Sequence, residues 1–255
     1  MLINNYQVEE EIGRGITAVV YRATNPQGQV VTLKMSRDND PDRLRQIKQE
    51  AEVLSWLNNE GVPHCYDYFE FEGQGCVTLE FVAGKTFKSL MQEQRPPYSE
   101  AQAVQWGIQL ADILDRIHTH PTPHIYRSLA PHHLLLTESG QLYLIDYGKV
   151  EPYKPDALFP AIGFAGYSPP EQYVGRPEPR GDIFSLGVFL YHVTTGRDPH
   201  LPHAAFLFHV LPPRAINPQL SPEFERIVLQ AVEHKASDRF TSIAAMREAL
   251  LACSA

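Results

Sequence analysis

Cysteines are few in this chain of 255 residues, and long apolar runs are missing from it. The three cysteines, Cys65, Cys76 and Cys253, show no paired spacing. We therefore expect neither a disulfide framework nor a zinc site, and we expect the reducing cytoplasm as the location. No run of 18 or more apolar residues occurs, and no basic-then-apolar leader opens the sequence, so no membrane segment is expected.

The chain also has no excess of basic residues over acidic ones. The formal net charge is −8 at pH 7. Sequence-independent binding of nucleic acid needs a basic surface, so we expect no nucleic-acid partner. A hydrophobic fraction of 43% with 20% charged residues is ordinary for a globular protein, and the length suits one large domain or two coupled lobes.

The most informative stretch is 124–148. Three leucines at 134–136, a Ser139-Gly140 turn and a second apolar run at 142–145 predict a strand, a tight turn and a second strand. The segment 126–133 precedes this hairpin, and the tripeptide Asp146-Tyr147-Gly148 follows it.

This layout resembles the catalytic loop of protein kinases, H-R-D-L-x-x-x-N, followed by their D-F-G tripeptide. Asp146 matches the aspartate of D-F-G. Three positions that carry the chemistry in active relatives differ: Ser128 replaces the catalytic aspartate, Ala130 replaces a phosphate-contacting lysine, and His133 replaces the metal-holding asparagine.

The first third alternates between β-prone runs and turns. Gly13 and Gly15 lack a Cβ, so the backbone there can approach a phosphate closely. With Val20 in register, the segment resembles the kinase glycine-rich loop, although Ala18 stands where the third glycine would be. A glycine hairpin of a small sheet is the alternative reading.

Lys34 ends an apolar run, and a cation in such a place needs a partner. Asp40 and Pro41 are typical of a helix start, and the apolar spacing continues to about residue 58. Glu50 falls on the apolar face of this helix and is the predicted partner of Lys34. Glu52 lies elsewhere on the helical wheel and is predicted to face water.

The segment 77–84 resembles the kinase hinge. The resemblance implies that Leu79 is the gatekeeper and that the backbones of Glu80 and Val82 meet an adenine edge. It also implies that Val20 and Leu135 lie on the two faces of a purine. By the same resemblance, Thr32 replaces a small alanine over the adenine and adds bulk and a hydroxyl there.

The remainder reads as helices. Ser99 with Gln102 forms a capping box, Ser221 precedes Pro222, and a last helix is predicted from about Ser242. By resemblance, 166–173 closes the activation segment and 181–188 opens a buried helix. There Asp182 holds the catalytic-loop backbone, and Arg239 pairs with Glu171.

The resemblance covers residues 6 to 251 and is closest to bacterial serine/threonine kinases. It implies an α+β, bilobal protein-kinase-like fold, with a small β-rich N-lobe that has one main helix and a larger, mainly helical C-lobe. We place the N-lobe at 1–82 and the C-lobe at 83–255, as parts of one kinase-like domain.

The three replacements remove the reactive groups. A serine hydroxyl is no base near neutral pH without an activator, alanine has no charge, and a neutral imidazole is a poor ligand for Mg²⁺. Arg127 remains and in many relatives meets a phosphate on the activation segment. Between Lys149 and Ala165, however, there is no Ser or Thr, only Tyr153.

The sequence therefore predicts a cytoplasmic pseudokinase that acts as a scaffold or allosteric signalling partner of another protein. It predicts weak ATP binding, with or without Mg or Mn, a metal contact at Asp146 and little phosphoryl transfer. The nucleotide-binding positions implied by the resemblance are Gly13, Gly15, Val20, Thr32, Lys34, Glu50, Leu79, Glu80, Val82, Leu135 and Asp146.

Other readings stay open. The runner-up is an active serine/threonine kinase, or another ATP-using transferase, with His132 or His133 as a displaced base. A third reading makes His133 and Asp146 ligands of a transition metal. The histidines at 118, 120 and 124 fit a surface cluster better than a metal site, and the proline-rich stretch 199–218 fits a covering loop better than a docking surface.

Overall fold

The chain folds into two compact units in a computed structural model that describes residues 1–201 and 206–253. One unit comprises residues 1–84 and 137–150, and the other comprises 85–136 and 151–255. The segment that carries Asp146 therefore groups with the N-terminal residues. The lobe boundary between residues 82 and 83 stays a prediction.

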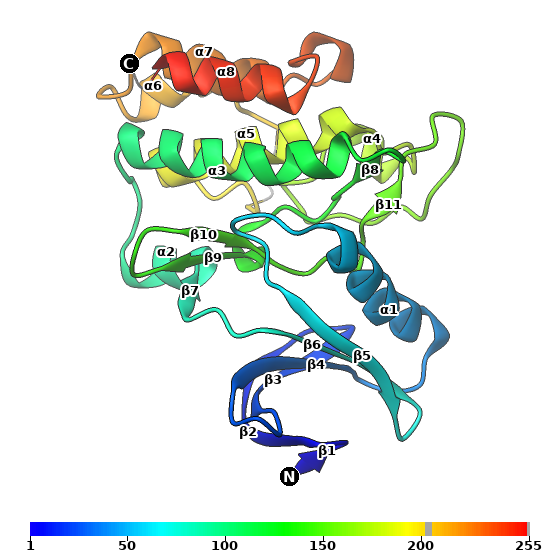
Figure 1. The fold of residues 1–255 in the computed structure, drawn as a ribbon. Coiled ribbons are helices and arrows are strands. Elements are labelled where there is room, and N and C mark those ends of the chain that lie inside the picture. The colour runs from blue at the N-terminus through cyan, green and yellow to red at the C-terminus, as the bar shows by residue number, and fades with distance from the viewer. Residues whose placement is uncertain (202–205, 254–255) are drawn as a thin grey trace. The chain divides into compact units, whose positions relative to one another are not determined.

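The N-terminal unit is built on a curled six-stranded antiparallel sheet with the strand order β1-β2-β3-β4-β6-β5 (Figure 1). Side chains alternate between its faces, so Val31 and Leu33 enter a core with Ile3, Ala23 and Cys76, while Thr32 and Lys34 lie on the opposite face. The strands are β1 (Leu2–Ile3), β2 (Tyr6–Arg14), β3 (Ala18–Thr24), β4 (Val30–Ser36), β5 (Cys65–Phe71) and β6 (Gln74–Glu80).

Helix α1 (Pro41–Trp56) packs against β4, β5 and β6. Asp40 caps it, because its side chain accepts hydrogen bonds from the backbone N–H groups of Asp42 and Arg43. Ile47, Glu50, Val53 and Leu54 form its buried face. The predicted helix and the exposed position of Glu52 are confirmed. The same unit contains β10 (Leu142–Leu144), whose Leu144 N–H donates to the carbonyl of Gly61 at 2.9 Å.

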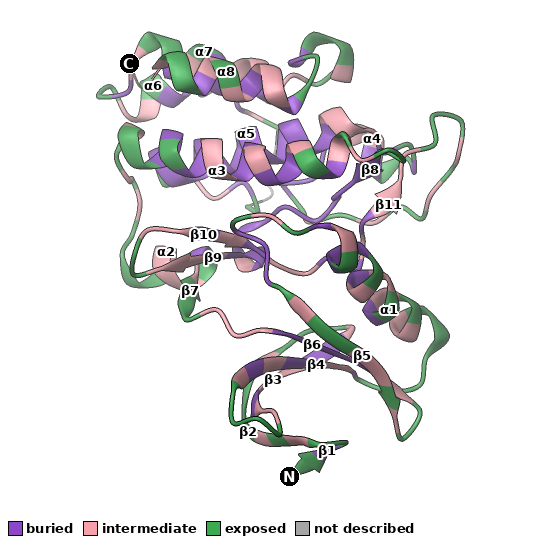
Figure 2. Cartoon of the chain, viewed as in Figure 1, coloured by how far each residue is buried: buried purple, intermediate pink, exposed green. Residues whose placement is uncertain are grey.

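The second unit is mainly helical and centres on α5, which is buried along nearly its whole length (Figure 2). Helices α3, α7 and α8 contact it. Gly187 brings α7 close, since a Cβ there would lie 2.6 Å from the Cβ of Ala231. The helices are α2 (Phe87–Glu93), α3 (Glu100–His118), α4 (Pro170–Tyr173), α5 (Pro179–Thr195), α6 (Pro213–Ile216), α7 (Pro222–Ala231) and α8 (Ile243–Cys253), with 3-10 turns η1 (Pro131–His133) and η2 (Ala236–Asp238).

Local sequence signals fix the starts of the main helices. Ser99 and Gln102 form the predicted capping box at α3, and the Ser221 side chain accepts from the Phe224 N–H at α7. The remaining strands are short: β7 (Gly84–Thr86), β8 (His124–Ile125), β9 (Leu134–Thr137) and β11 (Glu151–Pro152). β8 and β11 pair antiparallel.

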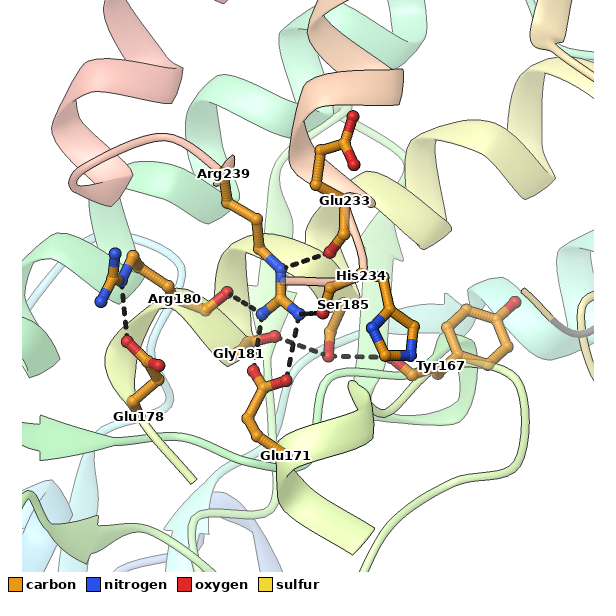
Figure 3. A network of polar contacts seen from close by, with 9 residues as sticks. All are labelled: Tyr167, Glu171, Glu178, Arg180, Gly181, Ser185, Glu233, His234 and Arg239. Carbon is orange, nitrogen blue, oxygen red and sulfur yellow. Dashed lines mark hydrogen bonds and ion pairs between the residues drawn. The ribbon is translucent and has the colours of Figure 1, made fainter. Parts of the chain in front are cut away.

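A buried ion pair ties distant parts of the helical unit together (Figure 3). Arg239 Nη1 lies 2.6 Å from Glu171 Oε1, and Nη2 lies 3.0 Å from Oε2, which is a bidentate pair. The same guanidinium donates to the backbone carbonyls of Arg180, Glu233 and His234. The predicted pairing of Arg239 with Glu171 is confirmed.

The proline-rich stretch 199–218 contains α6, and Tyr191 donates from its hydroxyl to the carbonyl of Leu211 at 2.8 Å. Part of this stretch, 202–205, lies outside the described residues. Over the ranges that the structure describes, no helix is long and apolar enough to cross a membrane.

Candidate functional site

Lys34 is the centre of a charged triad in the N-terminal unit. Its Nζ lies 2.6 Å from Glu50 Oε2 and 2.9 Å from Asp146 Oδ1. The side chains of Lys34 and Glu50 are 11% and 1% exposed, while that of Asp146 is 31% exposed. The predicted pairing of Lys34 with Glu50 is confirmed, and the Asp146 carboxylate is partly exposed beside the Lys34 ammonium.

Opposing effects set the charges of this triad. Burial lowers the pKa of Lys34, but the carboxylates of Asp146 and Glu50 outweigh burial and raise it above its usual value, so the ammonium form persists. Burial raises the pKa of Glu50 against the attraction of Lys34. Lys34 is therefore a fixed cation that can bind anionic oxygens.

The residues after Asp146 anchor it to α1. The Tyr147 N–H donates to Glu50 Oε1 at 3.2 Å, and the fully buried Tyr147 hydroxyl donates to the Leu144 carbonyl at 3.0 Å. A Cβ at Gly148 would lie 2.8 Å from the backbone oxygen of Gln46, so only glycine fits. Asp146 itself has a φ of 67°.

The glycine-rich turn lies at the start of the same sheet. Gly13 pairs with Val20 across β2 and β3, and the Gly15 N–H donates to the Ala18 carbonyl at 2.9 Å. Ile16 at its tip is 84% exposed. A Cβ at Gly13 would make only ordinary contacts with Val20, so packing inside the unit does not require glycine there.

The hinge positions follow from strand register. Leu79 is buried and stands opposite Thr32 in the β4–β6 pair. The Thr32 hydroxyl lies 3.4 Å from the Glu80 carbonyl and donates a long hydrogen bond to it. The Glu80 N–H donates to the His64 carbonyl, and Val82, which follows β6, is half-buried. Thr32 thus adds a polar contact to the backbone of Glu80, which was predicted to meet an adenine edge.

In the helical unit, Asp182 organises the loop 126–133. Its carboxylate accepts hydrogen bonds from the backbone N–H groups of Tyr126 and Arg127, each at 2.9 Å, as predicted. His118 Nε2 lies 2.9 Å from the same carboxylate. Arg127 has a φ of 68°, and these backbone contacts hold it there.

The prediction of surface histidines is wrong for His118 and His124. The His118 side chain is 8% exposed against Asp182, and His124 is buried in β8. Helical spacing alone does not reveal that Asp182 draws His118 inward. Among the described residues, no three His, Cys, Asp or Glu side chains gather closely enough to hold a metal ion.

The three replaced positions are all buried in the helical unit: Ser128, Ala130 and His133. The Ser128 hydroxyl has no hydrogen-bond partner among the described residues. His133 Nδ1 lies 2.8 Å from the Ser128 carbonyl, which can only accept, so Nδ1 carries the proton. Leu135 follows in β9 and is half-buried.

Arg127 is held by the segment that follows residue 150. Its Nη2 donates to the Pro160 carbonyl at 3.0 Å, and its guanidinium lies 5.3 Å from the centre of the Phe159 ring. Gln172 Nε2 bridges the Arg127 and Ile162 carbonyls at 3.0 and 2.8 Å. Sequence reasoning missed both Phe159 and Gln172, because neither has a local signal for this contact.

The order of these groups along the chain matches one known family. The sequence profile described as "Protein kinase domain" matches residues 6–251. The chain belongs to the protein kinase domain family. The curled sheet with α1 and the helical unit are accordingly the two parts of a protein kinase fold, as the sequence predicted.

Bacterial serine/threonine kinases are among the similar proteins. A probable serine/threonine-protein kinase of Clostridium acetobutylicum is 29% identical over 255 residues, which cover 94% of this chain and 38% of the relative. Serine/threonine-protein kinase PknL of Mycobacterium tuberculosis is 27% identical, with 96% of this chain and 65% of the relative covered. This kinase domain thus spans less than two thirds of the length of these relatives.

A solved structure supports the fold. The crystal structure of the Mycobacterium tuberculosis PknI kinase domain, determined as a double mutant, matches this kinase domain with a TM-score of 0.79. The match covers 100% of this chain and 98% of the other at 20% identity. Members of the family use ATP with divalent cations.

His192 on α5 should make the stability of this kinase domain depend on pH. Burial lowers its pKa from 6.5 to about 4, and its ring contacts the Tyr167 hydroxyl. The unfolded chain therefore binds one more proton than the folded chain between these two values, so stability is complete above pH 6.5 and falls as pH decreases toward 4. We expect the pH change from 7.5 to 5 to cost about 2 kcal/mol through this residue.

Urea unfolding of the wild type and of His192→Gln at both pH values measures this cost. Groups that face the ring, Tyr167, Asp198 and His200, are unchanged in the variant. The wild type should lose about 2 kcal/mol more than the variant between pH 7.5 and 5. Equal losses would show that His192 is protonated in the folded state as readily as in the unfolded one.

Proposed function

We propose that this kinase domain is a pseudokinase, a scaffold or allosteric partner of another protein in the cytoplasm that binds ATP weakly and transfers little phosphate. The observation that carries the proposal is the loss of three reactive groups on one loop, at Ser128, Ala130 and His133. Each loss removes a different contribution: the proton acceptor, a phosphate-contacting cation and a metal ligand.

The geometry at His133 supports this reading. Its Nδ1 proton is committed to the Ser128 carbonyl, so only Nε2 could meet a metal ion. A nitrogen donor is poorly matched to Mg²⁺, which prefers oxygen ligands in an octahedral shell. The buried Ser128 hydroxyl contacts no base that could activate it among the described residues.

Residual nucleotide binding is supported by the N-terminal unit. Lys34, Glu50 and Asp146 keep the charge arrangement that binds phosphates and a cation in relatives, with Asp146 as the proposed metal ligand. Gly13, Gly15, Val20, Thr32, Leu79, Glu80 and Val82 are the other proposed nucleotide contacts from this unit, and Leu135 is the proposed contact from the helical unit.

The test compares the wild type with Lys34→Met, which removes the fixed cation. Millimolar ATP, with Mg²⁺ or Mn²⁺ or neither, should raise the melting temperature of the wild type and leave that of Lys34→Met unchanged. Transfer from radiolabelled ATP to itself or to a generic protein should be equally slow in both. Faster transfer by the wild type would refute the pseudokinase assignment, and no thermal response to ATP would refute nucleotide binding.

A second candidate function is an active serine/threonine kinase with a displaced base. The half-buried His132, whose ring lies 4.1 Å from that of His133, favours it, because imidazole can accept a proton near neutral pH. A wild-type rate that falls to background in His132→Ala would support this candidate against the pseudokinase.

A further inference from the structure

Thr17 ties the glycine-rich turn, residues 13–18, to two other elements of the N-terminal unit. Its carbonyl accepts a hydrogen bond from the Arg37 N–H, just after β4, at 3.0 Å. Its hydroxyl donates to Gln46 Oε1 on α1 at 3.2 Å. The preceding residue, Ile16, is 84% exposed. The turn is therefore fixed through both the backbone and the side chain of Thr17, next to a tip that packs against little.

Gln46 also lies against the segment that carries Asp146. A Cβ at Gly148 would lie 2.8 Å from the Gln46 backbone oxygen, so glycine lets that segment approach α1 closely. Gln46 precedes Glu50 by four residues, which places both on one face of α1. Glu50 pairs with Lys34 at 2.6 Å. One face of this helix thus contacts the glycine-rich turn through Gln46 and the fixed cation through Glu50.

The two glycines give the turn little conformational preference of its own. A Cβ at Gly13 would lie 3.7 Å from Val20, and a Cβ at Gly15 would lie 3.7 Å from the Ala18 carbonyl, which are ordinary contacts. Glycine populates more backbone conformations than other residues, so ordering it costs more entropy. A contact that orders the turn in the free protein reduces the cost that a ligand has to overcome on binding.

The hydrogen bond between Thr17 and Gln46 suits this task. Both residues are half-buried, so water competes less for the hydroxyl than at an exposed side chain. Both side chains are uncharged, so removal of the contact leaves the charges of Lys34, Glu50 and Asp146 as they are. A change in affinity that follows such a removal therefore reports the order of the turn and not its electrostatics.

From these contacts we propose that Gln46 is a positioning residue for a phosphate-bearing ligand. Through Thr17 it holds the glycine-rich turn in one conformation, and this order raises the affinity of the turn for phosphates. The inference rests on the proposed nucleotide binding, in which this turn and Lys34 are phosphate contacts. It adds a means of regulation, since a displacement of α1 that draws Gln46 away from Thr17 releases the turn and weakens phosphate binding.

Hydrogen–deuterium exchange of the full chain without nucleotide measures the order of the turn. Thr17→Val removes the hydroxyl and keeps the β-branched shape, and Gln46→Met removes the acceptor and keeps the length. In each variant the amides of residues 13–18 should exchange about fivefold faster than in the wild type, the effect of one neutral hydrogen bond. The double variant should match the single ones, because both remove the same contact. Amides of residues 49–56 in α1 should be unchanged.

Calorimetric titration then measures the consequence for binding. Thr17→Val and Gln46→Met should bind ATP about fivefold more weakly than the wild type. Their affinity for adenosine, which has no phosphates, should stay within about twofold of the wild type. A variant with a merely damaged fold would lose affinity for both ligands.

Two controls match the valine variant. Thr17→Ser keeps the hydroxyl, so exchange at the turn and ATP affinity should both stay within about twofold of the wild type. Thr24→Val makes the same substitution at the other end of β3, where the hydroxyl donates to Glu9. It should also leave the turn and ATP affinity unchanged.

The outcomes separate this inference from the proposed function. Wild-type exchange at the turn in Thr17→Val and Gln46→Met would overturn the inference, and so would equal losses of affinity for ATP and adenosine. If the wild type binds ATP and both variants bind it as tightly, nucleotide binding stands and the inference fails. If the wild type binds neither ligand, nucleotide binding is refuted, while faster exchange in both variants still supports the ordering of the turn by Gln46.

Discussion

Combining Ser128→Asp, Ala130→Lys and His133→Asn should raise phosphoryl transfer from ATP by about 10²- to 10⁴-fold over the wild type. A positioned general base alone contributes a factor of this size. The lysine adds a charge that stabilises the transferred phosphate, and the asparagine restores an oxygen ligand for Mg²⁺. The measurement is the initial rate of transfer from radiolabelled ATP to a generic protein substrate.

The structure offers room for these changes. Asparagine carries an amide nitrogen at the same distance along the side chain as His133 Nδ1, so it can keep the hydrogen bond to the Ser128 carbonyl. Ala130 borders a cavity of about 590 Å³, which can accept a lysine side chain. Ser128 is 1% exposed, so its replacement by a charged residue is the costliest step, and melting curves of each variant should accompany the assay.

A matched control isolates the proton acceptor. The triple variant with Ser128→Asn in place of Ser128→Asp has the same shape at this position but cannot take a proton near neutral pH. It should stay at least about 10²-fold slower than the aspartate version. If the wild type is already as fast as the aspartate version, the replaced residues do not limit the reaction, and another base operates.

Replacing Arg239 by alanine should lower the free energy of unfolding by about 3–5 kcal/mol. The Arg239 side chain is fully buried, and Glu171 is 16% exposed, so the variant leaves a carboxylate without its cation in a dry site. The three carbonyls of Arg180, Glu233 and His234 lose their donor as well. Urea unfolding followed by circular dichroism measures the difference.

Arg226→Ala is the matched control for this variant. Arg226 pairs with Glu223 at 2.6 Å, but both side chains are at least half exposed, at 55% and 50%. Exposed pairs of this kind contribute well under 1 kcal/mol, so this variant should be close to the wild type. Similar losses in the two variants would mean that the buried pair adds no stability beyond that of a solvated one.

Much of the fold could be predicted because its signals are local. Asp40 before Pro41 and Ser99 with Gln102 cap helices through contacts within three residues, and these contacts form as expected. Lys34 with Glu50 was predictable for another reason, since a cation on an apolar strand must find a charge on the nearest buried helix face.

Contacts that depend on tertiary packing could not be predicted from the sequence. His118 turns inward because Asp182 accepts hydrogen bonds from three directions, and no spacing along the chain reveals that. The hydroxyl of Thr32 finds the Glu80 carbonyl only through the register of β4 against β6. A change of one residue in that register would place Thr32 on the opposite face.

The contacts that Arg127 makes with Pro160 and Phe159 have a consequence for regulation. In relatives that are activated by phosphorylation, the added phosphate pairs with this arginine and orders the activation segment. Here the Arg127 guanidinium already donates to the Pro160 carbonyl and lies against the Phe159 ring. The stretch 149–165 carries no Ser or Thr. An upstream enzyme that modifies serine or threonine therefore has no acceptor within residues 149–165.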